Sequence, residues 1–456
     1  MNSFIYTLIA FIVLIGILVT VHEFGHYWVA RYLGVKILRF SIGFGKPLWL
    51  TRFGKDNTEF AISAIPLGGY VKMLDETEGE VTPTDLPRAF NRQSLKVRTA
   101  IVVAGPLFNF LLAIIAFMGM YLLGITGMRA LVGEVTPHSL AEQAGFESGY
   151  EIVAVNTQPT LRWETVIQST LTEILDEQII TYSVRAVIPA DDASSFIKKQ
   201  REDQYDVVLD LNHLSIDDLS QGQFFEAVGI KPLRLPALLG EVEPGSAAMS
   251  AGLRVGDKIV TLDNQPVEDW RAWAEYIAEH PDVDIRTEVD RGGERLFLVL
   301  RPANIDGKGY AGVRISEDYF STERYGLGMA FLRGITKTWE TSVLTVRLLG
   351  KMLMLQLSPK NISGPISIAQ YAGYSAQRGF FMFLYFLGLV SVSLAIINLF
   401  PIPLLDGGHL LLYLLEAIKG GPVTENTQFL LQRVGLTLLL SLMGLAIFND
   451  LERLFS

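Results

Sequence analysis

The sequence has no cysteine among its 456 residues. Disulfide bonds and thiolate metal sites are therefore excluded, and any metal ion must be held by histidine and carboxylate side chains. Basic residues are also in deficit, because 38 lysines and arginines stand against 48 aspartates and glutamates, for a net charge of −10. This balance argues against a nucleic-acid partner.

Charge is unevenly distributed along the chain. Residues 127–325 carry 34 acidic and 18 basic side chains, a balance of −16, so the rest of the chain carries +6. The composition is half apolar yet 19% charged, which indicates membrane spans joined to soluble modules. We therefore expect an acidic soluble block inserted into a basic membrane-embedded part.

The first apolar run extends from Phe4 to about Ala30 and is long enough to cross a membrane. No basic n-region precedes it and no small-residue cleavage site follows it, so we expect a retained span and not a removed signal peptide. Several basic residues come next, before any acidic one: Arg31, Lys36, Arg39 and Lys46. By the positive-inside rule this loop is cytoplasmic and the N-terminus lies outside.

Three further runs have the length of a span, at about 100–125, 379–400 and 429–448. Four spans return the C-terminus to the outer side, together with the residues between the second and third spans. The sequence thus predicts a polytopic α-helical membrane protein with four transmembrane helices.

The first run contains His22-Glu23-Phe24-Gly25-His26. Histidines four residues apart lie on one helix face, where two imidazoles can grip one metal ion. The glutamate between them is then placed as a general base toward water. Chance recurrence of a short motif is the alternative, but an ionisable group within a membrane helix costs roughly 2.5–3.5 kcal/mol on insertion scales and usually has a function. We therefore predict a zinc site at this motif, with Glu23 as the catalytic base.

A hydrolytic zinc site usually has a third protein ligand and one open position. Asp406 is the best candidate, because it follows the third span at the same expected depth and side as the two histidines. His409 is the competitor, one turn further toward water. Pro401 and Pro403 break the helix just before Asp406 and free backbone carbonyls, so we also expect them to help position substrate.

Two asparagines are candidates for positioning substrate. Asn398, at the end of the third span, is suited to donate to an oxyanion or to substrate backbone, and an interhelical amide bond is an equally good interpretation. Asn109 is the only amide in the second span. Hydrogen bonding to a neighbouring helix is the commoner role for such a residue.

Residues 35–73 read as strands separated by glycines and by a Lys-Asp-Asn turn. They form either an ordinary small sheet or a hairpin that dips into the membrane beside the metal. In the second case an edge strand within 58–71 can pair with an extended substrate. Ile62 and Ser63 are the expected contacts of that substrate strand.

Residues 127–305 contain an internal repeat with a constant offset of 107 residues. Gly133-Glu134-Val135 recurs as Gly240-Glu241-Val242, and Trp163 recurs as Trp270. The order of strand, short helix ending at Ala-Gly, and strand resembles PDZ domains, which bind extended peptides at a sheet edge. We therefore expect tandem PDZ (α+β) domains, the first with an acidic insertion around 190–206.

Residues 326–357 have the pattern of an amphipathic helix. A position on the membrane surface is one interpretation and packing against the modules is the other. The full division is a first helix (1–30), a cytoplasmic or membrane-reentrant β region (31–98), a second helix (99–126), two modules (127–228 and 229–305), a linker with membrane-surface helices (306–378), a third helix (379–401), a cytoplasmic-side segment with the Leu-Asp-Gly motif (402–428) and a fourth helix (429–449).

Taken together, the motifs resemble those of the site-2 protease family of intramembrane zinc metalloproteases. The histidine motif at 22–26 is joined by the segment from Asn398 to Gly407, which is similar to the family's Asn-x-x-Pro-x-Pro-Leu-Asp-Gly signature with one extra residue before the leucine. Gly105 to Asn109 fits a Gly-x-x-x-Asn element, and Gly43-Phe44-Gly45 fits a membrane-reentrant β segment.

The resemblance implies regulated intramembrane proteolysis with bound zinc in a bacterial inner membrane. Its implied substrates are a single-span anti-sigma factor already trimmed on the periplasmic side and remnant signal peptides. The modules and both termini would then be periplasmic. The alternative is a membrane-tethered PDZ scaffold with a vestigial metal site, and the intact Glu23 favours the enzyme.

Overall fold

The computed structural model describes residues 2–77, 79, 81–174, 179–189, 197–212, 224–354, 356, 363–421 and 423–455. The chain forms two compact units. Met1–Ile125 and Arg324–Ser456 make up the first, here called the membrane unit, and Thr126–Glu323 make up the second, here called the repeat unit.

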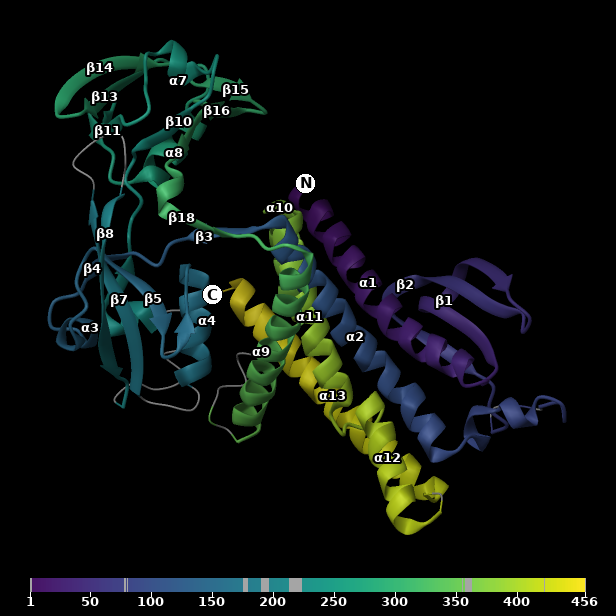
Figure 1. The fold of residues 1–456 in the computed structure, drawn as a ribbon. Helices are drawn as coiled ribbons and strands as arrows, with labels where there is room; N and C mark the ends of the chain where they lie inside the picture. The colour runs from purple at the N-terminus through teal and green to yellow at the C-terminus, as the bar shows by residue number, and fades with distance from the viewer. Residues whose placement is uncertain are drawn as a thin grey trace. The chain divides into compact units, whose positions relative to one another are not determined.

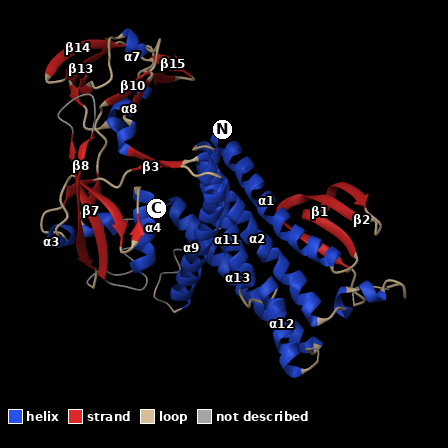
Figure 2. Ribbon diagram, viewed as in Figure 1, coloured by secondary structure: helices blue, strands red, loops and turns tan. Residues whose placement is uncertain are grey.

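Helices dominate the membrane unit (Figures 1 and 2). They are α1 (Asn2–Tyr32), α2 (Leu95–Leu123), α9 (Leu327–Leu353), α10 (Pro365–Gln377), α11 (Phe380–Leu399), α12 (Asp406–Lys419) and α13 (Glu425–Phe455). Of these, α1, α2, α11 and α13 are long and apolar enough to cross a membrane. The predicted four apolar helices are confirmed, which fits a polytopic membrane protein.

The helix α2 is the hub of this unit, because it packs against α1, α9, α11 and α12. Its N-terminus is capped by Ser94, whose side chain accepts a hydrogen bond from the backbone N–H of Val97. Ala113, Ala116 and Phe117 are among its fully covered residues. The apolar sequence of α2 is therefore used for packing along most of its length.

The helix expected over 326–357 is α9, although residues 355 and 357 lie outside the described residues. α9 packs against α2 and α11. At Gly334 the backbones approach so closely that a Cβ atom would lie 2.8 Å from the carbonyl oxygen of Ile114. The position on the membrane surface stays a prediction, and α9 joins the helix bundle of the membrane unit. The reason is the small residue at the contact, which lets two helices pack backbone to backbone.

The strands β1 (Ile37–Phe53) and β2 (Thr58–Met73) form one antiparallel sheet in the membrane unit. Both strands bend, so that the sheet contains four runs in the spatial order 69–73, 37–42, 58–62, 47–53. The bend in β1 lies at Gly43 and Gly45, which have φ of 90° and 86°; glycine adopts these values at no steric cost.

This order corrects the expected substrate edge. Ile62 pairs with Ile42 on one side and Trp49 on the other, so it lies inside the sheet. Ser63 is buried, and its hydroxyl lies 3.0 Å from that of Ser41. The prediction of a free edge at Ile62 and Ser63 is wrong, because β1 folds back and covers this run on both sides. Within the described part of this sheet, the free edges are 69–73 and 47–53.

The repeat unit contains two modules whose elements follow the same order up to β8 and β14; the first then has a helix before its closing strand, and the second has a hairpin. The first has β4 (Val132–Val135), α3 (Leu140–Ala144), β5 (Tyr150–Val155), β6 (Gln158–Pro159), α4 (Trp163–Ile174), β7 (Ile179–Pro189), β8 (Ile197–Asp210), α6 (Phe224–Val228) and β9 (Ile230–Pro232). The second has β10 (Leu239–Val242), α7 (Ala247–Ser250), β11 (Lys258–Leu262), β12 (Gln265–Pro266), α8 (Trp270–Glu279), β13 (Ile285–Arg291), β14 (Glu294–Leu300), β15 (Ala303–Ile305), β16 (Lys308–Tyr310) and β17 (Val313–Ile315).

The repeat is also structural. The sheet β6-β5-β7-β8 corresponds to β12-β11-β13-β14, and the pair β4-β9 corresponds to β10-β17. Residues at the 107-residue offset are buried in both cores, for example Ile152 and Ile259. That the modules are PDZ domains stays a prediction.

Both modules extend past their expected ends. β9 closes the first module by pairing with β4, and β17 closes the second by pairing with β10. Ala311 belongs to the second core, so the boundary at 305 cuts the module too early. In the acidic insertion, residues 190–196 lie outside the described residues.

Two further strands, β3 (Ile125–Met128) and β18 (Phe320–Glu323), pair with each other where the chain enters and leaves the repeat unit. The hydroxyls of Thr126 and Thr322 lie 2.7 Å apart.

Candidate metal centre

Three side chains converge between α1 and the first residue of α12. His22 and His26 stand one turn apart on α1, and ligand atoms of both, together with a carboxylate oxygen of Asp406, lie within 4.8 Å of one another. Nε2 of His22 is 3.2 Å from Oδ2 of Asp406, and Nε2 of His26 is 3.6 Å from Oδ1. The structure therefore brings together the three residues that the sequence singled out as ligands.

The arrangement fits a divalent cation. The two Nε2 atoms face each other at 3.2 Å, and Oδ2 of Asp406 is buried without a hydrogen-bond partner in the described residues. Lone-pair donors that converge in a buried space are stabilised when a cation lies among them. Two imidazoles and one carboxylate form a donor set that zinc accepts, with a position left for substrate or water.

His26 is held in the form that a metal needs. Its Nδ1 lies 2.8 Å from the backbone carbonyl oxygen of Ile101 in α2. A carbonyl can only accept, so Nδ1 carries the proton and Nε2 keeps its lone pair.

His22 is held by Asn109, also in α2. Nδ2 of Asn109 lies 3.2 Å from Nδ1 of His22, while its Oδ1 is buried without a partner among the described residues. The amide nitrogen and oxygen have nearly the same shape, and the hydrogen-bond network decides between them. With the two exchanged, Nδ1–H donates to Oδ1 and Nε2 keeps its lone pair, so we assign this orientation. Sequence reasoning missed this contact, and the substrate-positioning role expected for Asn109 stays a prediction.

Gly105 makes the close approach of α1 and α2 possible. A Cβ atom at this position would overlap Nε2 of His26 and lie 2.8 Å from Cε1 of His22. Any side chain here would therefore fill the space among the ligand atoms. The first residue of the Gly-x-x-x-Asn element is thus a glycine because a side chain at this position would clash with the candidate ligands.

Glu23 lies between the two histidines in sequence and faces the sheet. Its carboxylate lies near the backbone N–H of Val71. A Cβ atom on Gly69 would lie 3.1 Å from Cγ of Glu23. The carboxylate is thus next to the metal ligands and beside the free edge at 69–73.

The connector before Asp406 is closely packed. A Cβ atom on Gly407 would overlap the carbonyl oxygen of Phe400, and Gly435 of α13 packs against Pro403. Asn398 is half-buried near the end of α11 and Pro401 is exposed. Positioning roles for Asn398, Pro401 and Pro403 stay predictions.

His409 lies one turn beyond Asp406 and is exposed. Within the described part of the chain, the metal-type cluster contains Asp406 and not His409. The geometry therefore favours Asp406 as the third ligand.

A His-Glu-x-x-His helix whose histidines meet an aspartate among apolar helices defines a metallopeptidase site. The chain belongs to peptidase family M50, which it matches over residues 10–442. The expected membership of the site-2 protease family is therefore confirmed.

Similar proteins span the full length of this chain. It is 43% identical to the "Regulator of sigma E protease" of Salmonella typhi and 42% identical to the "Regulator of sigma-E protease RseP" of Escherichia coli (strain K12), with 100% of each chain covered. It is 40% identical, with the same coverage, to a "Putative zinc metalloprotease" of Vibrio cholerae. The motifs and the tandem modules predict a resemblance to the bacterial regulator of sigma-E protease within this family. These identities confirm that resemblance.

Replacing either kind of ligand should remove the metal. We expect purified His22→Phe and Asp406→Ala proteins to lose stoichiometric zinc, because two remaining ligands bind the ion too weakly to survive purification. His409→Ala is the matched control and should keep one zinc per chain in elemental analysis. Full zinc in Asp406→Ala together with loss in His409→Ala would reverse the assignment.

Proposed function

We propose that this protein hydrolyses peptide bonds within transmembrane segments of its substrates, with zinc held by His22, His26 and Asp406. The observation that carries the proposal is the ligand cluster of α1 and α12 in a unit of membrane-length apolar helices. When bound, zinc supplies Lewis acidity toward a carbonyl and a water molecule. Cleavage inside a membrane segment agrees with ligands that lie on a membrane-length apolar helix.

Glu23 acts as the general base and then as the proton donor. Its carboxylate neighbours the ligand histidines, so it can take a proton from water and deliver it to the departing amide nitrogen. Burial among α1 and the sheet limits competing water. The network that orients His22 and His26 would have no purpose in a vestigial site, which is why we prefer an enzyme to a scaffold.

A substrate helix must be unwound before its peptide bonds are accessible, and its freed backbone groups cost several kcal/mol each if they stay unpaired. We propose that the run 69–73 of β2 replaces those bonds by strand addition. Val71, which pairs with Phe40 of the neighbouring run 37–42, has its backbone N–H close to the Glu23 carboxylate. No described strand pairs with the run 69–73 on this side, so an added substrate strand would lie directly beside the general base.

The names of relatives support the proposed substrate class. Proteins of the same length and 42–43% identity are named regulators of sigma-E protease. We propose as substrates a single-span anti-sigma factor, trimmed on its outer side, and remnant signal peptides. The protein would act in a bacterial inner membrane, with the repeat unit and both termini in the periplasm.

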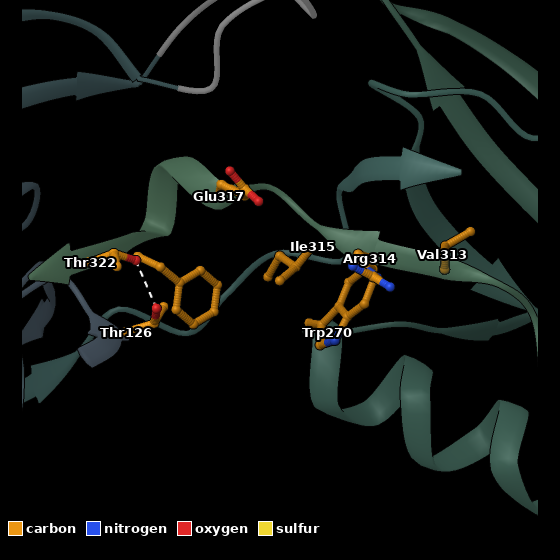
Figure 3. A pocket seen from close by; sticks show the side chains of 8 residues that line it. Thr126, Trp270, Val313, Arg314, Ile315, Glu317 and Thr322 are labelled. Atoms are coloured by element: carbon orange, nitrogen blue, oxygen red, sulfur yellow. Dashed lines mark hydrogen bonds between the residues drawn. The ribbon is translucent and has the colours of Figure 1, made fainter. Parts of the chain in front are cut away.

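The repeat unit has a groove suited to an extended peptide (Figure 3). Its volume is about 570 Å³, and Trp270 at the start of α8 lies opposite Val313 and Ile315 of β17. β17 pairs with β10 along one edge, and no other described strand covers its second edge. We propose that this edge takes up an exposed peptide end as an added strand, as PDZ domains do, and so selects substrates without chemistry of its own.

Glu23→Gln is the single experiment that separates enzyme from scaffold. The variant should keep its zinc and its melting temperature but lose turnover of a model transmembrane substrate by roughly 10²–10⁴-fold, because only the proton-accepting group is lost. Elemental analysis and thermal melting are the controls. Wild-type turnover in the variant would remove Glu23 from the mechanism.

The substrate edge can be mapped by disulfide trapping, since the native chain has no cysteine. In a Glu23→Gln background, Tyr70→Cys and Lys72→Cys should cross-link to single cysteines in the substrate, at substrate positions that step by two. Cβ atoms of paired strands lie about 4.5–5.5 Å apart, close enough for this chemistry. Thr51→Cys, on the other free edge, is the matched control. Equal cross-linking at Thr51→Cys would contradict the assignment of the edge.

Deleting the repeat unit should relax substrate selection and preserve catalysis. The ends to be joined are close, because the backbone N–H of Tyr325 donates to the carbonyl of Tyr121 at 3.1 Å. We expect a chain with Thr126–Glu323 replaced by a short Gly/Ser linker to bind zinc and to cleave untrimmed substrates that the full chain rejects. Continued rejection of untrimmed substrates by a folded, zinc-bound deletion protein would show that selection lies elsewhere.

A further inference from the structure

The helix α12 is not a continuation of α11, so packing contacts set its rotation. Asp406 is its first residue, and the connector from α11 contains Pro401 and Pro403. Proline interrupts helical hydrogen bonding, so the orientation of α11 is not passed on through a continuous helix. The rotation of α12 decides where the Asp406 carboxylate points.

One face of α12 carries Asp406, His409, Tyr413 and Glu416, at spacings of three, four and three residues. Glu416 lies about 15 Å along the helix from Asp406, at 1.5 Å per residue. A contact fixed at this distance controls both the rotation and the tilt of α12. The far end of the same face is thus the effective place to hold the ligand.

That far end is held by Arg98, in the first turn of α2. Its Nη2 donates to Oε1 of Glu416 at 2.7 Å, and the guanidinium lies over the ring of Tyr413, 4.9 Å from its centroid. Its Nε also donates to the carbonyl oxygen of Gln93 at 3.2 Å. The Arg98 and Glu416 side chains are only 16% and 17% exposed. A charge-assisted bond that is largely shielded from water has a defined geometry and more strength than an exposed ion pair.

Arg98 lies on the same face of α2 as the residues that contact the two histidines. Ile101 accepts from His26, Gly105 admits both histidines, and Asn109 contacts His22. Starting from Arg98, the successive steps along the sequence are three, four and four residues. This spacing places all four residues on one side of the helix. The same surface therefore reaches both α1 and α12.

We propose that Arg98, Glu416 and Tyr413 form a positioning clamp that sets Asp406 against the two histidines. The inference rests on the proposed zinc site, and it assigns to this clamp the alignment of the third ligand. Neither Arg98 nor Glu416 belongs to the ligand cluster, so both act through α12. Their substitution changes the angle at which Asp406 reaches the ion and leaves the two histidines where they are.

The test is zinc affinity of the purified full-length protein, measured by competition with a chelator. Arg98→Gln and Glu416→Gln should each weaken zinc binding by about tenfold, the lower end of the loss usual for groups that orient metal ligands. The double variant should lose no more than the weaker-binding single variant, because both substitutions break one contact. Arg88→Gln is the matched control: Arg88 makes a bidentate pair with Asp56 at 2.7 Å and does not contact α12, so its zinc affinity should equal the wild type.

Thermal melting of the zinc-free proteins separates a positioning role from a purely structural one. We expect the zinc-free variants to melt within a few degrees of the wild type while the shift produced by added zinc becomes smaller. Unchanged zinc affinity together with a lower melting temperature would overturn the clamp, as would losses that add in the double variant. A wild-type protein that binds no zinc would instead refute the metal centre itself, and the clamp with it.

Discussion

The candidate ligands come from α1 and α12, near opposite ends of the chain, and both helices are held against a single face of α2. That face offers a guanidinium, a backbone carbonyl, a glycine and an amide in succession, at Arg98, Ile101, Gly105 and Asn109. Each feature acts on a different part of the centre, and their spacing is fixed by the pitch of one helix. α2 also packs against α9 and α11, and it is the most buried of the four described membrane-length helices. The geometry of the whole centre therefore depends on this surface of α2 staying close to α1.

Much of the centre could be predicted from the sequence, because part of its information is local. His22 and His26 are four residues apart, so helix periodicity alone places them on one face. The absence of cysteine leaves few residue types as ligands, and Asp406 then stands out after an apolar run. The partners of those ligands could not be predicted. Asn109 contacts His22 across 87 residues, and no periodicity connects the two.

The strands give a second example of the same limit. Their positions in residues 37–73 follow from alternation and glycine turns, but the order of the runs does not. Ile62 was expected at an edge and lies between two neighbours, because β1 bends at Gly43 and Gly45 and returns on the far side. Module ends were missed for a related reason: β9 and β17 are short strands that come back to pair with the first strand of their module. Pairing between distant segments determines both outcomes, and local patterns carry little of that information.

The partners of the two histidines also suit an apolar setting. Ligand histidines are often oriented by carboxylates, whereas here the partners are a backbone carbonyl and an amide, both neutral. Each added charge inside a bundle of apolar helices has a large desolvation penalty. A divalent cation is balanced by the two carboxylates that lie at the centre, Asp406 and Glu23, and charged partners for the histidines would break that balance. Without the cation, two carboxylates remain against neutral imidazoles in a buried space. A metal ion bound here would therefore contribute to the stability of the contact between α1 and α12 as well as to the proposed chemistry. The neutral histidine partners on α2 would leave its charge balanced by the two carboxylates.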